Sequence, residues 1–152
     1  MLIYDVIIPV YRPDEKLKRL INALLSQSLL PRRIILINTE REEFLKFSPE
    51  EEFLAQSPRL KLYHISKAVC NHGATRNYGV SLSDAPFFVC MTDDAVPAGN
   101  TMMEELLKPF LSESIGISYA RQLPDPDCGI IERYTRSFNY PETAKIKTAK
   151  DL

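Results

Sequence analysis

The most informative part of this chain is the stretch Pro86-Phe87-Phe88-Val89-Cys90-Met91-Thr92-Asp93-Asp94. Its six apolar residues, 86–91, are typical of a parallel strand that is covered on both faces. The adjacent carboxylates of Asp93 and Asp94 repel each other unless a cation relieves the repulsion. In open α/β sheets, ligands bind outside the carboxyl ends of the strands. The stretch therefore predicts a metal-bound phosphorylated ligand, while a capping turn with solvated acids is the plainer alternative.

The rest of the chain alternates strand patterns with helical patterns, as βαβ units do. Strands are predicted over 2–9, 33–38, 60–65, 86–91 and 115–119. Helices are predicted over 13–25, 74–82, from 101 onward and over 127–139, with short helical pieces within 40–58. We therefore expect an α/β fold: a Rossmann-like, mostly parallel sheet flanked by helices, in a single domain over residues 1–152.

The helix from residue 101 has two expected features. Thr101 and Glu104 have the spacing of a capping box, in which each side chain bonds the other residue's backbone N–H. Met102, Leu106 and Phe110 follow at helical spacing and are expected to form its apolar face.

Composition limits the class of protein. The chain has 152 residues, 45% of them hydrophobic and 26% charged, with a net charge of −1. These values indicate an ordinary globular domain and give no support to a nucleic-acid partner, which needs a basic face. No apolar run is long enough to span a bilayer, and the amino terminus enters a strand directly. We expect a cytoplasmic protein, and a peripheral position at the inner face of the membrane stays open.

The cysteines and histidines do not indicate a structural metal site. Cys70, Cys90 and Cys128 are odd in number and widely spaced, so we expect reduced, mostly buried thiols. Cys70 and His72 are close in sequence, but no second Cys/His pair is near enough to complete a zinc site. His64 is predicted to lie on the surface of a strand.

Common enzyme motifs are absent from the sequence. It has no Gly-x-Ser-x-Gly elbow, no phosphate-binding Gly-x-x-x-x-Gly-Lys loop and no Gly-x-Gly-x-x-Gly fingerprint, and it contains five glycines in all. Their absence argues against most hydrolases, P-loop enzymes and dehydrogenases.

Polar or aromatic clusters follow four of the predicted strands, at 9–11, 38–40, 71–76 and 92–94. Because parallel strands bring their carboxyl ends to one edge of the sheet, these clusters are expected to converge on a single crevice. The convergence of all four, more than any one of them, indicates a binding site.

Each cluster member has a functional and a structural interpretation. Tyr11 can wall in a flat base, or it can fix a strand–helix turn. Asn38, Thr39 and Glu40 can bind base or ribose hydroxyls, or they can form a turn and a helix cap. Arg76 offers a planar guanidinium that suits phosphate, or it pairs with a surface carboxylate.

Several of these stretches match a known family. They are VIIPVYRPDEKL at 6–17, LLSQSLLPRRIILINTE at 24–40, NHGATRNYGVSLS at 71–83, FFVCMTDDAVPAG at 87–99, ISYARQLPDPD at 117–127 and RSFNYPE at 136–142. With them, the chain resembles family-2 glycosyltransferases of the GT-A fold, and most of all bacterial rhamnosyltransferase-like members. The resemblance spans nearly the whole chain and stops before the acceptor side of these enzymes. We therefore expect a C-terminally incomplete catalytic domain.

The resemblance implies a nucleotide-sugar donor, such as a UDP- or dTDP-sugar, and a glycan or glycolipid acceptor. The residues that it implies near the nucleotide are Pro9, Val10 and Tyr11 at the base, Thr39 and Glu40 at the base or ribose, and Arg76. It implies Mg²⁺ or Mn²⁺ on Asp94, with Asp93 at the ribose or at a metal-bound water.

Two residues depart from the family pattern, and no catalytic residue is assigned. Thr92 stands where many relatives have an aspartate, and Arg12 stands where an asparagine is common. Family members invert the anomeric centre by direct displacement with a carboxylate base. That base lies in a part of the relatives that the resemblance does not reach.

Two other classes compete with this interpretation. A non-catalytic α/β nucleotide- or metal-binding module, such as a receiver-like domain, would need an acidic pair after the first strand, where this chain has Pro9, Val10 and Tyr11. A nucleotidyltransferase would begin with a glycine- and arginine-rich loop that this amino terminus lacks.

Overall fold

The computed structural model describes the chain except residues 1, 113, 125–126, 149 and 151–152. The chain divides into two compact units, 1–108 and 109–152. The first unit contains the whole sheet, and its topology positions the candidate site. The single-domain organisation over 1–152 stays a prediction.

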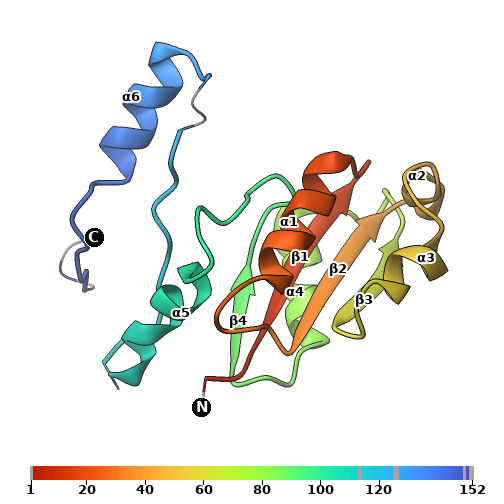
Figure 1. Ribbon diagram of the computed structural model, residues 1–152, viewed down its shortest axis with the longest axis horizontal. Helices are drawn as coiled ribbons and strands as arrows, with labels where there is room; N and C mark the ends of the chain where they lie inside the picture. The colour runs from red at the N-terminus through yellow and green to blue at the C-terminus, as the bar shows by residue number, and fades with distance from the viewer. Residues whose placement is uncertain (1, 113, 125–126, 149, 151–152) are drawn as a thin grey trace. The chain divides into compact units, whose positions relative to one another are not determined.

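The first unit is built on a four-stranded parallel sheet with the strand order β3-β2-β1-β4 (Figure 1). The strands are β1 (Tyr4–Tyr11), β2 (Arg33–Thr39), β3 (Leu60–Ile65) and β4 (Phe87–Cys90). All neighbouring strands pair in parallel. Four of the predicted strands are thereby confirmed, and their carboxyl ends lie along one edge.

Helices lie between successive strands and after the last one. They are α1 (Glu15–Leu25), α2 (Arg41–Leu45), α3 (Glu50–Ala55), α4 (His72–Ser81) and α5 (Met102–Leu107), followed by the 3₁₀ helix η1 (Lys108–Leu111). The chain moves outward from β1 to β2 and β3 and then back across to β4. Because such crossovers are right-handed, α1 and α4 cover opposite faces of the sheet (Figure 1). Among the described residues, no helix combines the length and the apolar character needed to cross a lipid bilayer.

Helix α1 follows from its sequence pattern. Its N-cap is Asp14, whose side chain accepts a hydrogen bond from the backbone N–H of Lys16 at 2.8 Å. The buried side chains recur at helical spacing: Leu17, Leu20, Ile21 and Leu24. This stripe packs onto the sheet, and the helix confirms the one predicted over 13–25.

Helix α4 packs close to the sheet through Gly79. A Cβ atom at this position would overlap the Cγ2 methyl group of Ile7 on β1 and would lie 3.4 Å from Cγ1 of Ile37 on β2. The glycine therefore sets the distance between helix and sheet.

Replacing Gly79 with alanine is expected to destabilise the protein. The extra methyl group overpacks a close-packed core, which costs about 1–3 kcal/mol. Gly73→Ala in the first turn of α4 is the matched control, because its nearest neighbour is an atom of Asn71 at 3.5 Å. In urea unfolding followed by circular dichroism, we expect the control to match the wild type or exceed it by up to about 1 kcal/mol. Equal stabilities of the two variants would contradict this account.

A cluster of charged side chains lies at the amino-terminal end of the sheet. At the amino-terminal end, the fully buried carboxylate of Asp5 on β1 accepts hydrogen bonds from Arg32 Nη2 at 2.7 Å, Arg33 Nη2 at 2.9 Å and Ser83 Oγ at 2.7 Å. Asp84 accepts from both arginines at 2.5 Å. This cluster ties together β1, β2 and the α4–β4 turn.

Three expectations about the chain after α4 are wrong. The stretch 115–119 forms no strand, and Ile117 and Tyr119 are 86% and 63% exposed. Its alternation is strand-like, but an alternating pattern makes a strand only where the segment pairs with another strand. The side chain of Thr101 forms no cap, and Glu104 accepts instead from Ser28 Oγ at 2.9 Å. The fully buried residues of α5 are Met103 and Leu107, one position away from the predicted face.

Strand β4 is less covered than its apolar sequence predicts. It is an outer strand of the sheet, Phe88 is 51% exposed and Cys90 is also exposed. An outer strand receives fewer neighbours than a central one, so the expected cover on both faces is wrong for this strand.

The second unit contains the predicted helix near the carboxyl terminus, α6 (Ile130–Asn139). Four large apolar side chains of this helix are exposed: Ile130, Ile131, Tyr134 and Phe138. The rings of the last two stack with their centroids 6.3 Å apart.

Candidate functional site

Three of the predicted site residues meet in one hollow at the carboxyl edge of the sheet. Tyr11, Asp93 and Asp94 line a space of about 230 Å³. The other lining residues come from the β1–α1 turn and the first turns of α1: Arg12, Asp14, Lys16 and Leu17. The hollow therefore combines an aromatic wall with three carboxylates and two cations.

The two strand ends explain this meeting. Tyr11 is the last residue of β1, and its side chain is 39% exposed at the rim. Strand β4 pairs with β1 up to Cys90, and the N–H of Met91 still donates to the carbonyl of Ile7 at 3.0 Å. The chain then turns, with the N–H of Ala95 donating to the carbonyl of Thr92 at 3.3 Å. This turn carries both aspartates to the end of β1.

The electrostatics distinguish the two aspartates. Burial raises the pKa of Asp93, and the negative charge of Asp94 raises it further. Hydrogen bonds to the carboxylate from its own backbone N–H and from that of Tyr11 offset part of the rise. Asp93 is half-buried, whereas Asp94 is exposed. A raised pKa at a carboxylate inside a hollow marks a candidate functional site.

The donor set fits Mg²⁺ or Mn²⁺ held together with a ligand. These ions are commonly bound through one or two carboxylates, and substrate phosphates and water complete the shell. No group of three or more His, Cys, Asp or Glu side chains in the described residues is arranged to hold a metal ion. Asp93 and Asp94 therefore suit a shared ion and not a protein-only cage.

The remaining predicted residues lie along the same edge outside the hollow. Val10 and Thr39 are buried, and Pro9 is half-buried. Thr39 is the register partner of Tyr11, and its hydroxyl donates to the sulfur of Cys70 at 3.3 Å. Their side chains shape the strand ends and are turned away from solvent.

Arg76 lies on α4, at the edge but not in the hollow. Its Nη1 donates to the carbonyl of His72, one turn earlier, at 3.0 Å. Although part of Cys90 is exposed, burial of its thiol raises the pKa, and the positive charge of Arg76 lowers that pKa in part. The role of Arg76 toward a nucleotide stays a prediction.

Residues after β1 and β2 adopt an uncommon backbone conformation. Arg12 has φ 52° and Glu40 has φ 66°, and both are non-glycine residues in the left-handed region. They follow Tyr11 and Thr39, which are register partners. The Nε of Arg12 also lies 3.2 Å from Oε2 of Glu43 on α2. In the sequence, Arg12 stood out only as a departure from the pattern of the family that the chain resembles. Asparagine tolerates the left-handed conformation better than arginine does.

Some expectations for cysteine and histidine are corrected. Three cysteines are free: Cys70, Cys90 and Cys128. The first two are exposed and the third is half-buried, so the expectation that the thiols are mostly buried is wrong. His64 is not a surface residue of β3. It is half-buried, and its Nδ1 lies 3.0 Å from Nδ2 of Asn38.

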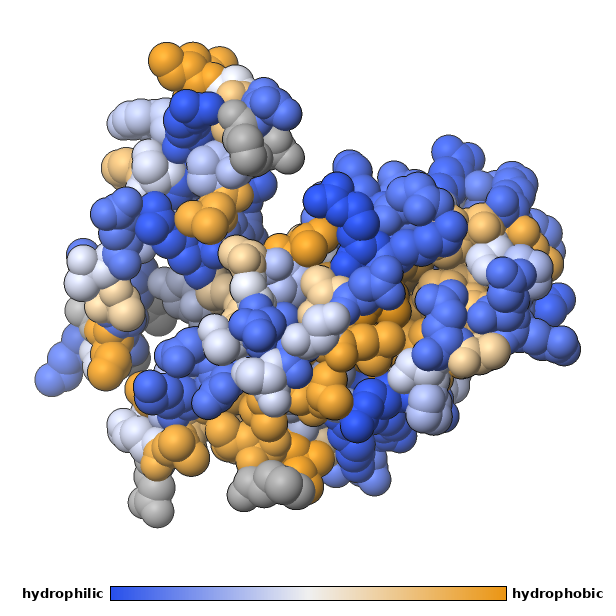
Figure 2. Space-filling model, viewed as in Figure 1, coloured by the Kyte–Doolittle hydropathy of each residue, from blue (hydrophilic) through white to orange (hydrophobic). Residues whose placement is uncertain are grey.

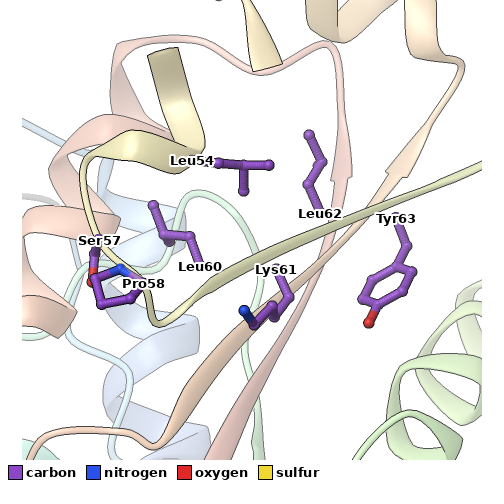
Figure 3. A pocket seen from close by; sticks show the side chains of 7 residues that line it. All are labelled: Leu54, Ser57, Pro58, Leu60, Lys61, Leu62 and Tyr63. Atoms are coloured by element: carbon purple, nitrogen blue, oxygen red, sulfur yellow. The ribbon is translucent and has the colours of Figure 1, made fainter. Parts of the chain in front are cut away.

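A second hollow lies beside the outer strand β3, between this strand and α3. It measures about 360 Å³, and Figure 3 shows Leu54, Leu60 and Leu62 on one side of the strand, with Lys61 and Tyr63 on the other. Its lining is mainly apolar and brings no pair of acids or bases together. It lacks the chemistry of the first hollow.

Known proteins match this chain over almost its full length. A family model described as "Glycosyl transferase family 2" matches residues 5–151. The O-antigen chain rhamnosyltransferase RfbN of Salmonella typhimurium (strain LT2) is 26% identical over 149 residues, which are 97% of this chain and 46% of the relative. The corresponding enzyme WbaN of Salmonella anatum is 26% identical over 151 residues, which are 98% and 46%. The chain thus spans about half the length of these curated relatives.

Solved structures share the fold. The crystal structure of S. aureus TarS 1-349 superposes with a TM-score of 0.56 at 18% identity, covering 73% of this chain and 32% of TarS. TarS 1-349 in complex with UDP-GlcNAc gives a TM-score of 0.54 at 15% identity, covering 78% and 38%. The expected GT-A type of α/β fold is confirmed by this likeness. Because the family model extends from the start of β1 nearly to the last residue, the chain belongs to glycosyl transferase family 2.

Proposed function

We propose that this chain is the nucleotide-sugar-binding part of an inverting glycosyltransferase. In the full reaction, a sugar passes from a nucleoside diphosphate to a cell-surface polysaccharide or glycolipid. The observation that carries the proposal is the single hollow shared by Tyr11, Asp93 and Asp94 at the carboxyl edge of a parallel sheet. The names of the relatives support it: two are O-antigen chain rhamnosyltransferases, and TarS was crystallised with UDP and with UDP-GlcNAc.

Residues in the hollow and beside it have different roles in binding the donor. Tyr11 presents an aromatic ring as a wall for the base, and Pro9, Val10, Thr39 and Glu40 shape the adjoining strand ends. Asp94, the more exposed acid, holds Mg²⁺ or Mn²⁺, and Asp93 accepts from the ribose or from a metal-bound water. When bound, the ion neutralises the charge on the leaving diphosphate. Arg12 and Lys16 add positive charge beside the diphosphate, and Arg76 does so from α4.

The acceptor side and the general base belong, in this proposal, to residues outside this chain. The chain matches about half of each curated relative. A cytoplasmic location, peripheral at the inner face of the membrane, completes the proposal.

Calorimetric titration tests donor binding directly. UDP and dTDP are titrated into the protein with Mn²⁺, with Mg²⁺ and with EDTA, and AMP serves as a nucleotide of another class. We expect one of the two diphosphates to bind in the presence of metal and to lose affinity in EDTA. If neither diphosphate binds in any of the three conditions, the proposed function is wrong. Binding that ignores EDTA would refute the metal role alone.

A further inference from the structure

Three hydrogen bonds hold Glu40 in its left-handed conformation. Its N–H donates to the carbonyl of Ile65 on β3 at 2.9 Å, and its carbonyl accepts from the N–H of Glu43 at 3.1 Å. Its Oε1 accepts from the N–H of Lys67. A residue with a Cβ atom persists in this region only where its surroundings fix it, and such residues concentrate at functional sites.

Asn38 supplies the contact that reaches Glu40 from inside the protein. Its side chain is fully buried on β2, and its Nδ2 donates to the carbonyl of Glu40 at 2.9 Å. The same Nδ2 lies 3.0 Å from Nδ1 of His64, the register partner of Asn38 on β3. An amide nitrogen has two hydrogens, so it can donate to both acceptors.

The two acceptors fix the orientation of this amide. Turning the amide over would place Oδ1 against the carbonyl oxygen of Glu40, where two acceptors face each other. In the observed orientation, Oδ1 is buried and has no hydrogen-bond partner among the described residues. An unpaired buried acceptor is unfavourable, but the two hydrogen bonds that Nδ2 donates offset this cost.

His64 is itself held in position. Its ring meets Phe44 of α2 edge-on, with the centroids 6.0 Å apart. Its Nε2 lies 3.1 Å from Oε1 of Glu50 on α3, and the same oxygen accepts from Nε of Arg41 at 2.6 Å. The ring therefore packs against α2 and its Nε2 lies near Glu50 of α3, although Nε2 forms no hydrogen bond among the described residues. Its Nδ1 is directed at Asn38. Figure 2 shows that the surface over α2 is mostly hydrophilic.

We propose that Asn38 and His64 are positioning residues for nucleotide binding. His64 holds the amide of Asn38, which holds the backbone of Glu40 in the conformation that directs this residue toward the nucleotide. The inference rests on the proposed function and extends it to two residues that do not touch the ligand.

The test compares His64→Leu with His64→Gln. Leucine removes the acceptor for Asn38, whereas the side-chain oxygen of glutamine restores it. Lys61→Ala, an exposed change on the same strand, is the control. The first readout needs no ligand: amide hydrogen exchange at Glu40 and Lys67. We expect exchange about tenfold faster in His64→Leu, the effect of losing one hydrogen bond, and near wild-type rates in the other two variants.

The second readout is the affinity for UDP or dTDP with Mn²⁺. We expect His64→Leu to bind about tenfold more weakly, with recovery in His64→Gln. In a protein that already carries Glu40→Ala, we expect His64→Leu to cause no further loss of nucleotide affinity, because His64 acts through Glu40. Unchanged exchange, or a loss of affinity that adds to that of Glu40→Ala, would overturn the inference. If the wild type binds neither nucleotide, the proposed function fails, and the exchange rates still decide whether His64 positions Glu40.

Discussion

Replacing Asp5 with asparagine is expected to lower the free energy of unfolding by about 3–5 kcal/mol, because it leaves a buried charge cluster without its central partner. The Asp5 carboxylate is fully buried and accepts from Arg32, Arg33 and Ser83. Asparagine offers one acceptor oxygen in place of two and no charge. Because the chain has seven tyrosines and no tryptophan, far-ultraviolet circular dichroism is the suitable probe of urea unfolding.

The same prediction has a defined pH dependence. Burial alone would raise the pKa of Asp5, but hydrogen bonds from Arg32, Arg33 and Ser83 outweigh it and lower the pKa from 3.8 to about 2. A carboxyl group with a lowered pKa stabilises the fold above its unfolded value and loses this contribution as the pH falls through its folded value. The difference between wild type and Asp5→Asn should therefore be constant above about pH 5 and shrink by roughly 2 kcal/mol toward pH 2.

Asp84→Asn is the matched control for this experiment. Asp84 binds the same two arginines, but its side chain is 79% exposed. An exposed ion pair contributes at most about 1 kcal/mol, so this variant should stay close to the wild type. If both variants lost the same stability, burial of Asp5 would not be the cause.

Replacing Asp94 with alanine is expected to reduce the affinity for UDP or dTDP in the presence of Mn²⁺ by at least about 100-fold. Loss of residues behind the metal ligands already costs 10–100-fold, and Asp94 is proposed as the ligand itself. Calorimetry on the folded variant measures this effect, and Glu51→Ala, which removes an exposed acid on α3, controls for net charge. Unchanged binding in Asp94→Ala would remove the metal role from this residue.

The pH dependence of metal binding separates the two aspartates. Burial and the charge of Asp94 raise the pKa of Asp93, so protons compete with the metal at a higher pH than they do for an ordinary aspartate. Affinity for Mn²⁺ and nucleotide should fall as the pH is lowered through the mildly acidic range. In Asp93→Asn, this fall should shift to lower pH, whereas the same profile as wild type would exclude Asp93 from the site.

Much of the fold could be predicted from the sequence, because its signals are local. The apolar segments that became β1 to β4 and the stripe of α1 are periodic within a few residues, and Asp14 caps its helix as its residue type favours. The predicted strand at 115–119 had the same local signal. It failed because a strand must also pair with another strand, and alternation within a few residues carries no information about pairing.

The candidate site divides in the same way. The positions of Tyr11, Asp93 and Asp94 after strands could be predicted from the sequence, and parallel pairing brings them into one hollow. The inward turn of the Asn38 amide to His64 and the left-handed backbone of Glu40 became known from the folded structure. Periodicity and caps depend on neighbours in the chain, whereas side-chain burial and backbone strain depend on contacts between β2 and β3, whose register the sequence does not state.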